Sequence, residues 1–462
     1  MSLDRWVVVC LVPLVAWILL SGLDDLFVIF VSFLPGTSRF RWPRDEELAR
    51  KGERRIAILV PLWREDGVIE RMLERNLAVI RYRKYDIFTG VYPNDARTRA
   101  AVRRITRRHS RVHIAVNSRS GPTSKGDCLN HAYRSMQEYE AARGFRYEVV
   151  MLHDAEDLIH PDSLRLVNYY SRHYQMVQVP VLPLATGIGE FTHGAYCDEF
   201  AESQLKDIPV RRRLGGFLPS CGVGTAFDRD ALDRIGEERS GLVFDPESLT
   251  EDYEAGLRLH AMGCRQIFLP LRMDADGAVA TREFFPRNFR AAARQRSRWV
   301  AGIALQGWER HGWRTGWRQA YWLWRDRKGL VGNLLSPVAN LIFLYGLGSF
   351  LAAAWHGHPW PLAVAVPPAM AHLCRTTFAV SLAQTAVRMR ASARVYGWRI
   401  AALAPARAPW ANLVNCAATL AALSQYIGAR RTRRALAWRK TEHVYPHEAV
   451  PGYSGATFGQ RA

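Results

Sequence analysis

One short segment near the middle of the chain constrains the fold most: an apolar run, residues 149–152, that stops at the acidic sequence Asp154-Ala155-Glu156-Asp157. A run of this kind is typical of a buried parallel strand, and the side chains after it face the crevice where open α/β sheets bind ligands. Carboxylates there suit Mg²⁺ or Mn²⁺ shared with substrate phosphates, which favours a nucleoside diphosphate substrate. Taken alone, the cluster is equally compatible with a solvated acidic turn before a helix.

Strands and helices alternate upstream of this segment. The pattern predicts strands at 56–60, 85–92 and 112–116, with helices at 68–80 and 96–109 between them. This order predicts right-handed βαβ units and a mostly parallel sheet. Glu65 and Asp95 follow the first two strands, where their carboxylates are placed to accept hydrogen bonds from a base or ribose. Acids and amides also favour turns for local reasons, so both interpretations stay open.

Three loops carry further polar groups. Lys125 precedes a predicted helix, where it could neutralise a diphosphate or could simply mark the start of a solvated helix. The surrounding loop lacks the spacing of a Walker A motif, so it is not a phosphate loop of that type. A glycine-rich stretch, residues 218–227, allows either close approach to a ligand or a tight hairpin. Thr250 is a plausible helix N-cap, followed by Glu251 and Asp252 in the first turn. A second acidic site of this kind is what deprotonation of an acceptor hydroxyl requires.

The composition points to a membrane rather than to nucleic acid. Of the 462 residues, 48% are hydrophobic, which excludes disorder for most of the chain, and the formal charge is +20. The sequence shows no zinc-finger or RNP-like pattern, and basic residues cluster beside apolar segments, where membrane topology places them. The seven cysteines show no paired spacing, so neither a disulfide framework nor a zinc site is expected.

Three apolar segments are long enough to cross a bilayer: residues 6–34, 330–355 and 361–387. The first lacks a basic n-region and a cleavage site, so it is interpreted as an uncleaved anchor despite Asp24 and Asp25. Arginines after residue 387 place the central domain and the later chain in the cytoplasm by the positive-inside rule. Residues 410–427 are apolar too, but the arginines that follow favour a re-entrant or interfacial segment.

Residues 288–308 combine arginines with aromatic and aliphatic side chains. This pattern predicts an amphipathic interfacial helix, extended by a belt of tryptophans. Within it, the sequence Gln295-Arg296-Ser297-Arg298-Trp299 is either a functional motif or the polar face of that helix.

Three separated motifs, flanked by membrane segments, follow one another along the chain: Asp154-Ala155-Glu156-Asp157, Thr250-Glu251-Asp252 and Gln295-Arg296-Ser297-Arg298-Trp299. This set resembles the inverting family 2 glycosyltransferases of the cellulose and hyaluronan synthase type. Four further stretches are similar to the NfrB-like phage-adsorption glycosyltransferase subgroup: residues 60–65, 92–95, 121–130 and 438–443.

The resemblance implies a role for each matching residue. Pro61, Glu65, Asp95, Lys125 and Asp154 would bind the nucleotide-sugar donor. Asp252 would be the catalytic base, with Glu251 beside it. Gln295, Arg298 and Trp299 would bind diphosphate and acceptor sugar, and the metal, Mg²⁺ or Mn²⁺, would be held by Asp154 with Glu156 or Asp157. The second acid of the family's D-x-D motif is Glu156 in this sequence, and Asp157 follows it directly. Either Glu156 or Asp157 could therefore join Asp154 on the metal.

The resemblance also implies an architecture. A GT-A-like (Rossmann-like) α/β domain with a mostly parallel sheet would occupy residues 41–285, behind an N-terminal transmembrane anchor at 1–40. Interfacial helices would follow at 286–328, two transmembrane helices at 329–390, and an interfacial or re-entrant segment with a basic tail at 391–462. The protein would be a multi-pass protein of the bacterial inner membrane with its catalytic domain in the cytoplasm.

The implied activity is transfer of a hexosyl or N-acetylhexosaminyl group, from a UDP-linked or other nucleoside diphosphate donor to a growing saccharide, in exopolysaccharide synthesis. Its partners would be the donor, the acceptor, the lipid bilayer and a cyclic-di-GMP-sensing or export protein, without nucleic acid. Two alternatives remain: transfer of a single sugar to polyprenyl phosphate, and a non-catalytic membrane scaffold or phage-receptor component.

Overall fold

A computed structural model of the chain describes residues 3–37, 40–313, 316–433, 436 and 445. Its centre is a seven-stranded sheet in the order β3-β2-β1-β4-β7-β5-β8. The strands are β1 (Ile56–Pro61), β2 (Tyr85–Val91), β3 (Val112–Val116), β4 (Val149–Leu152), β5 (Met176–Gln178), β7 (Thr225–Asp228) and β8 (Gln266–Phe268). The predicted 438–443 motif lies outside the described residues.

The sheet is mostly parallel, as the alternation of strands and helices predicts. β1 pairs in parallel with both β2 and β4, and β5 pairs in parallel with β8. β7 is the exception, because it runs antiparallel to β4 and β5. Its first residue, Thr225, pairs with Leu152 at the end of β4, so the chain re-enters the sheet at its carboxyl edge and runs back.

Helices cover both faces of the sheet. Ile56, Ile58 and Val60 of β1 pack in one core with α3 (Ile69–Val79), α4 (Ala96–Thr106) and α6 (Ser163–Tyr170). Ala57 and Leu59 pack in the other core with α5 (Lys125–Arg143), α9 (Arg229–Glu237) and α10 (Glu251–Ala261). Successive strand side chains point to opposite faces, so a continuous apolar run is what a strand buried on both faces requires.

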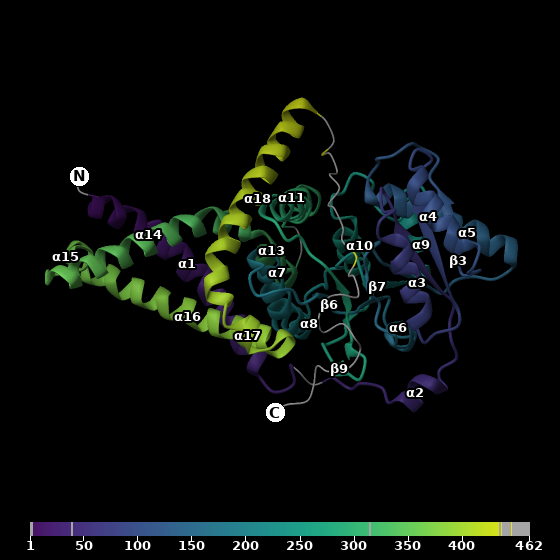
Figure 1. Cartoon of the computed structure of the whole chain (residues 1–462), viewed down its shortest axis with the longest axis horizontal. Coiled ribbons are helices and arrows are strands. Elements are labelled where there is room, and N and C mark those ends of the chain that lie inside the picture. Colours follow the sequence, from purple (N-terminus) through teal and green to yellow (C-terminus); the bar gives the residue numbers. More distant parts are fainter. Residues whose placement is uncertain (1–2, 38–39, 314–315, 434–435, 437–444, 446–462) are drawn as a thin grey trace.

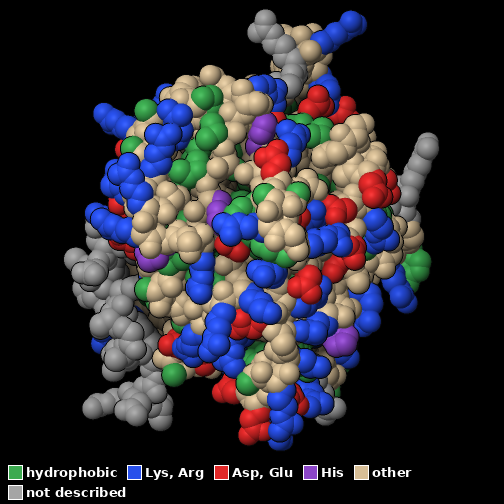
Figure 2. All heavy atoms as spheres, turned by 90° about the vertical axis from the view of Figure 1, so that its right-hand side faces the viewer, with side chains coloured by type: hydrophobic (Ala, Val, Ile, Leu, Met, Phe, Trp, Pro, Cys, Tyr) green, Lys and Arg blue, Asp and Glu red, His purple; other side chains and the backbone are tan. Residues whose placement is uncertain are grey.

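Smaller elements complete this domain. A two-stranded parallel sheet joins β6 (Val181–Pro183) to β11 (Thr281–Glu283), and a hairpin joins β9 (Met273–Asp274) to β10 (Gly277–Ala278). Helix α2 (Asp45–Arg50) precedes β1. The face of the domain that is farthest from the long helices carries many Lys and Arg side chains interspersed with acids (Figure 2). Such a surface is suited to water rather than to lipid.

The long helices form a bundle at the opposite end of the molecule (Figure 1). They are α1 (Leu3–Phe33), α14 (Gly329–His356) and α16 (Pro368–Tyr396), with the short α15 (Pro361–Ala365) before α16. Among the described residues, two helical stretches are long and apolar enough to cross a membrane, Leu3–Phe33 and Trp317–His356. The third predicted span lies within α15 and α16, where Arg375 is exposed; α16 packs along α1.

Asp24 and Asp25 of α1 are paired rather than exposed to lipid. The Nζ of Lys328 lies 2.8 Å from a carboxylate oxygen of Asp24 and 2.7 Å from one of Asp25. Arg325 also pairs with both acids. Paired acids are the arrangement that a membrane helix tolerates, and they join α1 to α13 (Trp317–Arg327).

A third group of helices connects the bundle to the sheet domain. It comprises α7 (Phe191–Glu202), α8 (Ile208–Arg213), α11 (Phe289–Trp299), α12 (Gly307–His311), α17 (Trp398–Ala401) and α18 (Ala404–Thr432), with π-helical segments at Ser203–Asp207 (η1) and Val300–Gln306 (η2). The apolar 410–427 segment lies within α18, which packs against α7, α11 and α14. The predicted helix at 288–308 is thus α11 followed by η2 and α12, packed against protein on at least one side.

Candidate functional site

Three acids gather where β4 ends. Asp157 is fully buried, and one of its oxygens accepts hydrogen bonds from the backbone N–H of Asp154, at 3.0 Å, and from Nδ1 of His153, at 2.6 Å. Burial lowers the pKa of His153 to about 3, so this ring is neutral and donates from Nδ1. Asp157 therefore braces the turn, while Asp154 and Glu156 are the other two acids of the cluster.

Lys125 contacts this cluster directly. Its Nζ lies 2.7 Å from Oδ1 and 3.0 Å from Oδ2 of Asp154. It begins α5, whose N-cap Ser124 accepts a hydrogen bond from the Asp127 N–H. Burial acts to lower the pKa of Lys125, but Asp154 and two further acids outweigh burial and hold that pKa above its usual value. The lysine is thus a fixed positive charge at a helix N-terminus, a combination that suits an anion.

An open pocket lies beside this ion pair. Four of the five predicted donor-binding residues line it, Pro61, Glu65, Lys125 and Asp154, and so does Arg298. The remaining lining residues are Leu62, Trp63, Tyr92, Thr123, Ser124, Cys128 and Ala155. One pocket therefore lies between the carboxyl ends of β1 and β4, the start of α5 and α11, which is distant in the sequence.

Asp95 supports the wall of this pocket instead of lining it. Its Oδ2 accepts a hydrogen bond of 2.6 Å from the backbone N–H of Arg64, and its Oδ1 accepts one of 3.3 Å from Thr98, at the start of α4. The carboxylate thereby ties the β1 loop to the end of β2. In the same wall, the rings of Trp63 and Tyr92 pack edge to face with centroids 5.2 Å apart.

The second acidic site lies on α10 and faces the first. Burial and the charge of Asp252 raise the pKa of Glu251 to about 8, and burial also raises the pKa of Asp252 against the opposing effect of Lys125. A Cβ at Gly222 would lie 2.4 Å from Oδ2 of Asp252 and 3.5 Å from Nζ of Lys125. The glycine-rich stretch therefore closely approaches a carboxylate of the protein itself, and its approach to a ligand stays a prediction. Gly222 also has a φ of +75°, which favours glycine.

Thr250 occupies the predicted N-cap position of α10, but its side chain makes no capping hydrogen bond. It packs instead against η2, where a Cβ on Gly302 would lie 2.4 Å from its hydroxyl oxygen. This contact brings the helix that carries Arg298 close to the helix that carries Asp252.

Arg298 lines the same pocket as Lys125 and Asp154. Burial lowers its pKa, and the charges of Glu251, Asp154 and Asp252 act in the opposite direction. Arg296, two residues earlier, is held elsewhere by Glu199 at 2.7 Å and by the side chain of Asn415 at 2.8 Å. The two arginines of the motif therefore have different structural positions.

Trp299 lies in an aromatic cluster rather than in an exposed belt. Its ring centroid is 6.2 Å from that of Tyr196, 6.3 Å from that of Phe200 and 6.4 Å from that of Phe285. The ring is partly buried among these side chains. Gln295, one turn earlier on α11, is also partly buried.

Glu283 is a polar residue of the site that the sequence motifs miss. It ends β11, and burial and the charges of Asp157 and Asp154 raise its pKa well above the usual value. Leu158 forms an antiparallel bridge with Arg282, which fixes β11 beside the acid cluster. Only this tertiary pairing reveals the residue, because nothing in its local sequence marks it.

The donor set fits a hard divalent cation. Asp154 and Glu156 offer only oxygen atoms, and the charges of Asp157 and Asp154, together with burial, raise the pKa of the neighbouring Glu283 well above its usual value, so negative charge is concentrated there. Oxygen ligands with concentrated negative charge are what Mg²⁺ and Mn²⁺ prefer.

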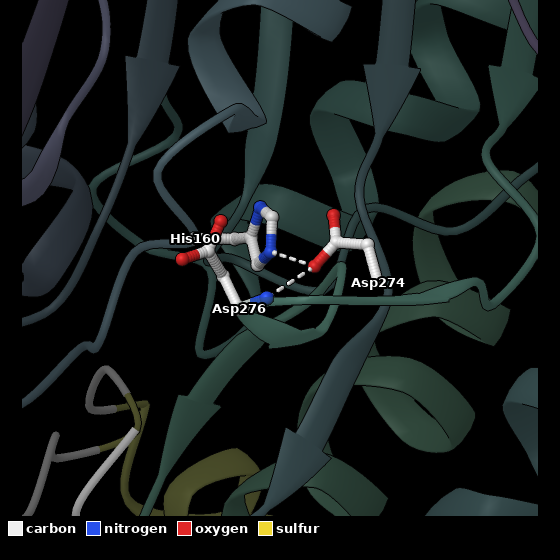
Figure 3. A group of neighbouring side chains, drawn as sticks. All are labelled: His160, Asp274 and Asp276. Atoms are coloured by element: carbon white, nitrogen blue, oxygen red, sulfur yellow. Dashed lines mark hydrogen bonds and ion pairs between the residues drawn. The ribbon is translucent and has the colours of Figure 1, made fainter. Parts of the chain in front are cut away.

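Another group of possible ligands lies outside this pocket: His160, Asp274 and Asp276 (Figure 3). His160 Nε2 lies 3.2 Å from Asp274 Oδ1, the same oxygen that accepts the Asp276 N–H at 2.9 Å. Arg81 forms an ion pair with the Asp276 carboxylate. These contacts account for the group as an ion-pair cluster at the β9–β10 hairpin.

Comparisons with known proteins found similar sequences and a similar solved structure. Two curated relatives, bacteriophage adsorption protein B of Escherichia coli strain K12 and bacteriophage N4 adsorption protein B of Escherichia coli O157:H7, are each 36% identical over 92% of this chain. The chain spans about 60% of their length. A mannosyltransferase from Pyrobaculum calidifontis, solved in complex with GDP-Man and Mn2+, covers 88% of this chain and 99% of its own, at 18% identity and a TM-score of 0.48.

The family model described as glycosyltransferase-like family 2 matches residues 54–302. This region contains the sheet, both acidic sites and Arg298, and it confirms the resemblance inferred from the motifs. The chain belongs to glycosyltransferase-like family 2.

Proposed function

We propose that this protein transfers a sugar from a nucleoside diphosphate, UDP being the first candidate, to a hydroxyl of a growing saccharide with inversion. The observation that carries the proposal is the convergence of Lys125, Asp154 and Arg298 at one pocket, from three segments far apart in the sequence. Asp252 lies close enough to act electrostatically on both Lys125 and Arg298. Two cationic side chains and two separate acidic sites are what diphosphate binding and acceptor deprotonation need.

The donor side of the pocket is assigned to Pro61, Glu65, Lys125 and Asp154. Lys125 and Arg298 would contact the diphosphate, because both are held beside the acids and both line the cavity. Asp95 would act on the nucleotide through the loop that it fixes, since both of its oxygens already accept backbone hydrogen bonds.

Asp154 and Glu156 are the residues that would hold Mg²⁺ or Mn²⁺. Asp157 is the poorer candidate for a ligand, because its Oδ2 already accepts hydrogen bonds from His153 and from the Asp154 backbone. When bound, the cation offsets the charge that develops on the departing diphosphate. Asp157 would keep the turn in the shape that presents the other two carboxylates.

Asp252 would take the proton of the acceptor hydroxyl. Its raised pKa suits a base, since burial makes this carboxylate a stronger proton acceptor than a solvated one despite the opposing charge of Lys125. Glu251 would hold a proton at neutral pH, because its pKa is about 8, and so would leave the negative charge on Asp252. Arg298 would meanwhile balance charge on the diphosphate as the bond to the sugar breaks.

Gln295 and Trp299 are assigned to the acceptor side. Trp299 presents part of its ring beside the motif arginine, and sugar rings stack on aromatic faces.

We propose a multi-pass arrangement in the bacterial inner membrane, with the sheet domain in the cytoplasm, because the arginine-rich segments lie on the domain side of the long helices. A surface saccharide as product agrees with the names of the two bacteriophage adsorption relatives.

The test is nucleoside diphosphate release by the purified, membrane-inserted protein over a panel of UDP- and GDP-sugars. We expect turnover of at least one donor with Mg²⁺ or Mn²⁺, loss of that turnover on chelation, and its return when metal is added back. Equal release with and without chelator would contradict the metal assignment, and release from no donor would contradict the proposal. Mass analysis of the product separates a polymer from a single lipid-linked sugar.

A further inference from the structure

Gln178 ends β5, is 1% exposed, and uses its whole amide in hydrogen bonds. Its Oε1 accepts from the Cys221 N–H at 2.9 Å and from the Thr225 hydroxyl at 2.6 Å. Its Nε2 donates to the carbonyls of Val179, at 2.7 Å, and Val223, at 3.0 Å. A buried primary amide needs two donors and two acceptors around it, and Gln178 finds all four.

Two of these four partners, Cys221 and Val223, lie just before β7, and a third, Thr225, is the first residue of β7. We call residues 218–224 the glycine-rich loop. Ser220 adds a bond of 2.9 Å to the hydroxyl of Thr225 and accepts the Gly222 N–H at 3.3 Å. Gln178 thus fixes the shape of this loop from the sheet side, on the strand next to β7.

The other side of the glycine-rich loop touches the helix that carries Asp252. A Cβ at Gly222 would lie 2.4 Å from Oδ2 of Asp252, so the loop backbone covers this carboxylate. Farther along α10, a Cβ at Gly256 would lie 3.1 Å from both Leu218 O and Ser220 N. The loop and the helix therefore pack backbone against backbone, and a shift of one moves the other.

We propose that Gln178 is a positioning residue for Asp252, which it holds in place through the glycine-rich loop. The inference rests on the proposed function in one respect, that Asp252 is the base. A methionine at this position would fill the same space but would leave the carbonyl of Val223 and the N–H of Cys221 without their amide partner. The loop would then move away from Asp252, and water would enter.

The experiment compares Gln178→Met with wild type in the diphosphate-release assay. We expect kcat to fall by between about tenfold and a hundredfold, since small misplacements of reacting groups cost rates of that order. The KM for donor and the affinity for UDP with Mn²⁺ should stay within about twofold, because Gln178 does not line the donor pocket.

The pH profile supplies a readout that a general loss of packing would not move. Lys125, Asp154, Glu251 and Arg298 interact with Asp252 from the other elements in both proteins, and Cys221 interacts with it from the loop, so only the loop side changes. Entry of water relieves the burial that raises the pKa of Asp252, and the acid limb of kcat/KM should move to lower pH.

Gln175→Met is the matched control, because Gln175 lies just before the other end of β5 and accepts the Arg265 N–H at 2.9 Å. We expect its kcat and acid limb to match wild type. Thr225→Val removes one of the four bonds with little change in shape, and it should shift kcat and the acid limb in the same direction by less. If Gln178→Met does not fold, the result with Thr225→Val decides.

Wild-type kcat and pH profile in folded Gln178→Met and Thr225→Val would overturn the inference, as would an equal effect in Gln175→Met. A wild-type protein that releases no diphosphate, or an Asp252→Asn variant with full activity, would instead overturn the proposed function. The two failures are therefore distinguishable.

Discussion

Replacement of Arg298 by lysine separates a diphosphate clamp from a lipid contact. Lysine keeps the charge but loses the planar fork that binds two phosphate oxygens at once. Arg298 lines the pocket with Lys125 and Asp154, and the acids on α10 act on its charge. A hydrogen bond to a charged group contributes about 1.5–3 kcal/mol, so loss of one arm of the fork should reduce kcat/KM by about 10- to 150-fold.

The assay is diphosphate release by protein purified in detergent and by the same protein in lipid nanodiscs. Arg294→Lys is the control, because Arg294 is exposed on the same helix and should tolerate the change in both settings. If Arg298→Lys, properly inserted, keeps kcat/KM within about twofold of wild type, Arg298 does not clamp diphosphate. A defect in nanodiscs that disappears in detergent would likewise indicate a lipid contact.

Three other results are expected. An unperturbed aspartate titrates near pH 3.9, so the raised pKa of Asp252 predicts that kcat/KM still climbs with pH above that value, as the base loses its proton; an acid limb at or below the unperturbed value would contradict the shift. Gly222→Ala places a Cβ against Asp252 and requires a φ of +75°, so it should lose most turnover while UDP binding, measured by titration, persists. Glu156→Gln should mainly weaken Mn²⁺ affinity, whereas Asp157→Asn should mainly lower Tm, because Asp157 braces the turn. If instead Asp157→Asn mainly weakens Mn²⁺ affinity and Glu156→Gln mainly lowers Tm, Asp157 is the ligand.

Local patterns predict the sheet domain well because strand burial leaves a direct trace in sequence. The unbroken apolar run of β1 is buried on both faces, and the acids that follow β4 lie at the carboxyl edge. Lys125 begins a helix as predicted, since the loop before it ends in a residue suited to capping, Ser124. These features depend on a few neighbouring residues each.

Features that depend on tertiary pairing could not be predicted in this way. The antiparallel direction of β7 follows from where the chain re-enters the sheet, not from the composition of the strand. Arg296 and Arg298 look equivalent in sequence, yet the packing of α11 sends one to Glu199 and the other to the pocket. Glu283 reaches the acid cluster only because β11 pairs beside it.

The role of Asp252 is tested most directly by the rate of diphosphate release by Asp252→Asn, measured beside wild type with saturating donor and Mn²⁺. We expect release to fall by at least about a hundredfold, as loss of a general base requires. The affinity for UDP with Mn²⁺ should stay near the wild-type value, because Asp252 does not line the donor pocket. Release at the wild-type rate would contradict the assignment of Asp252 as the base that activates the acceptor.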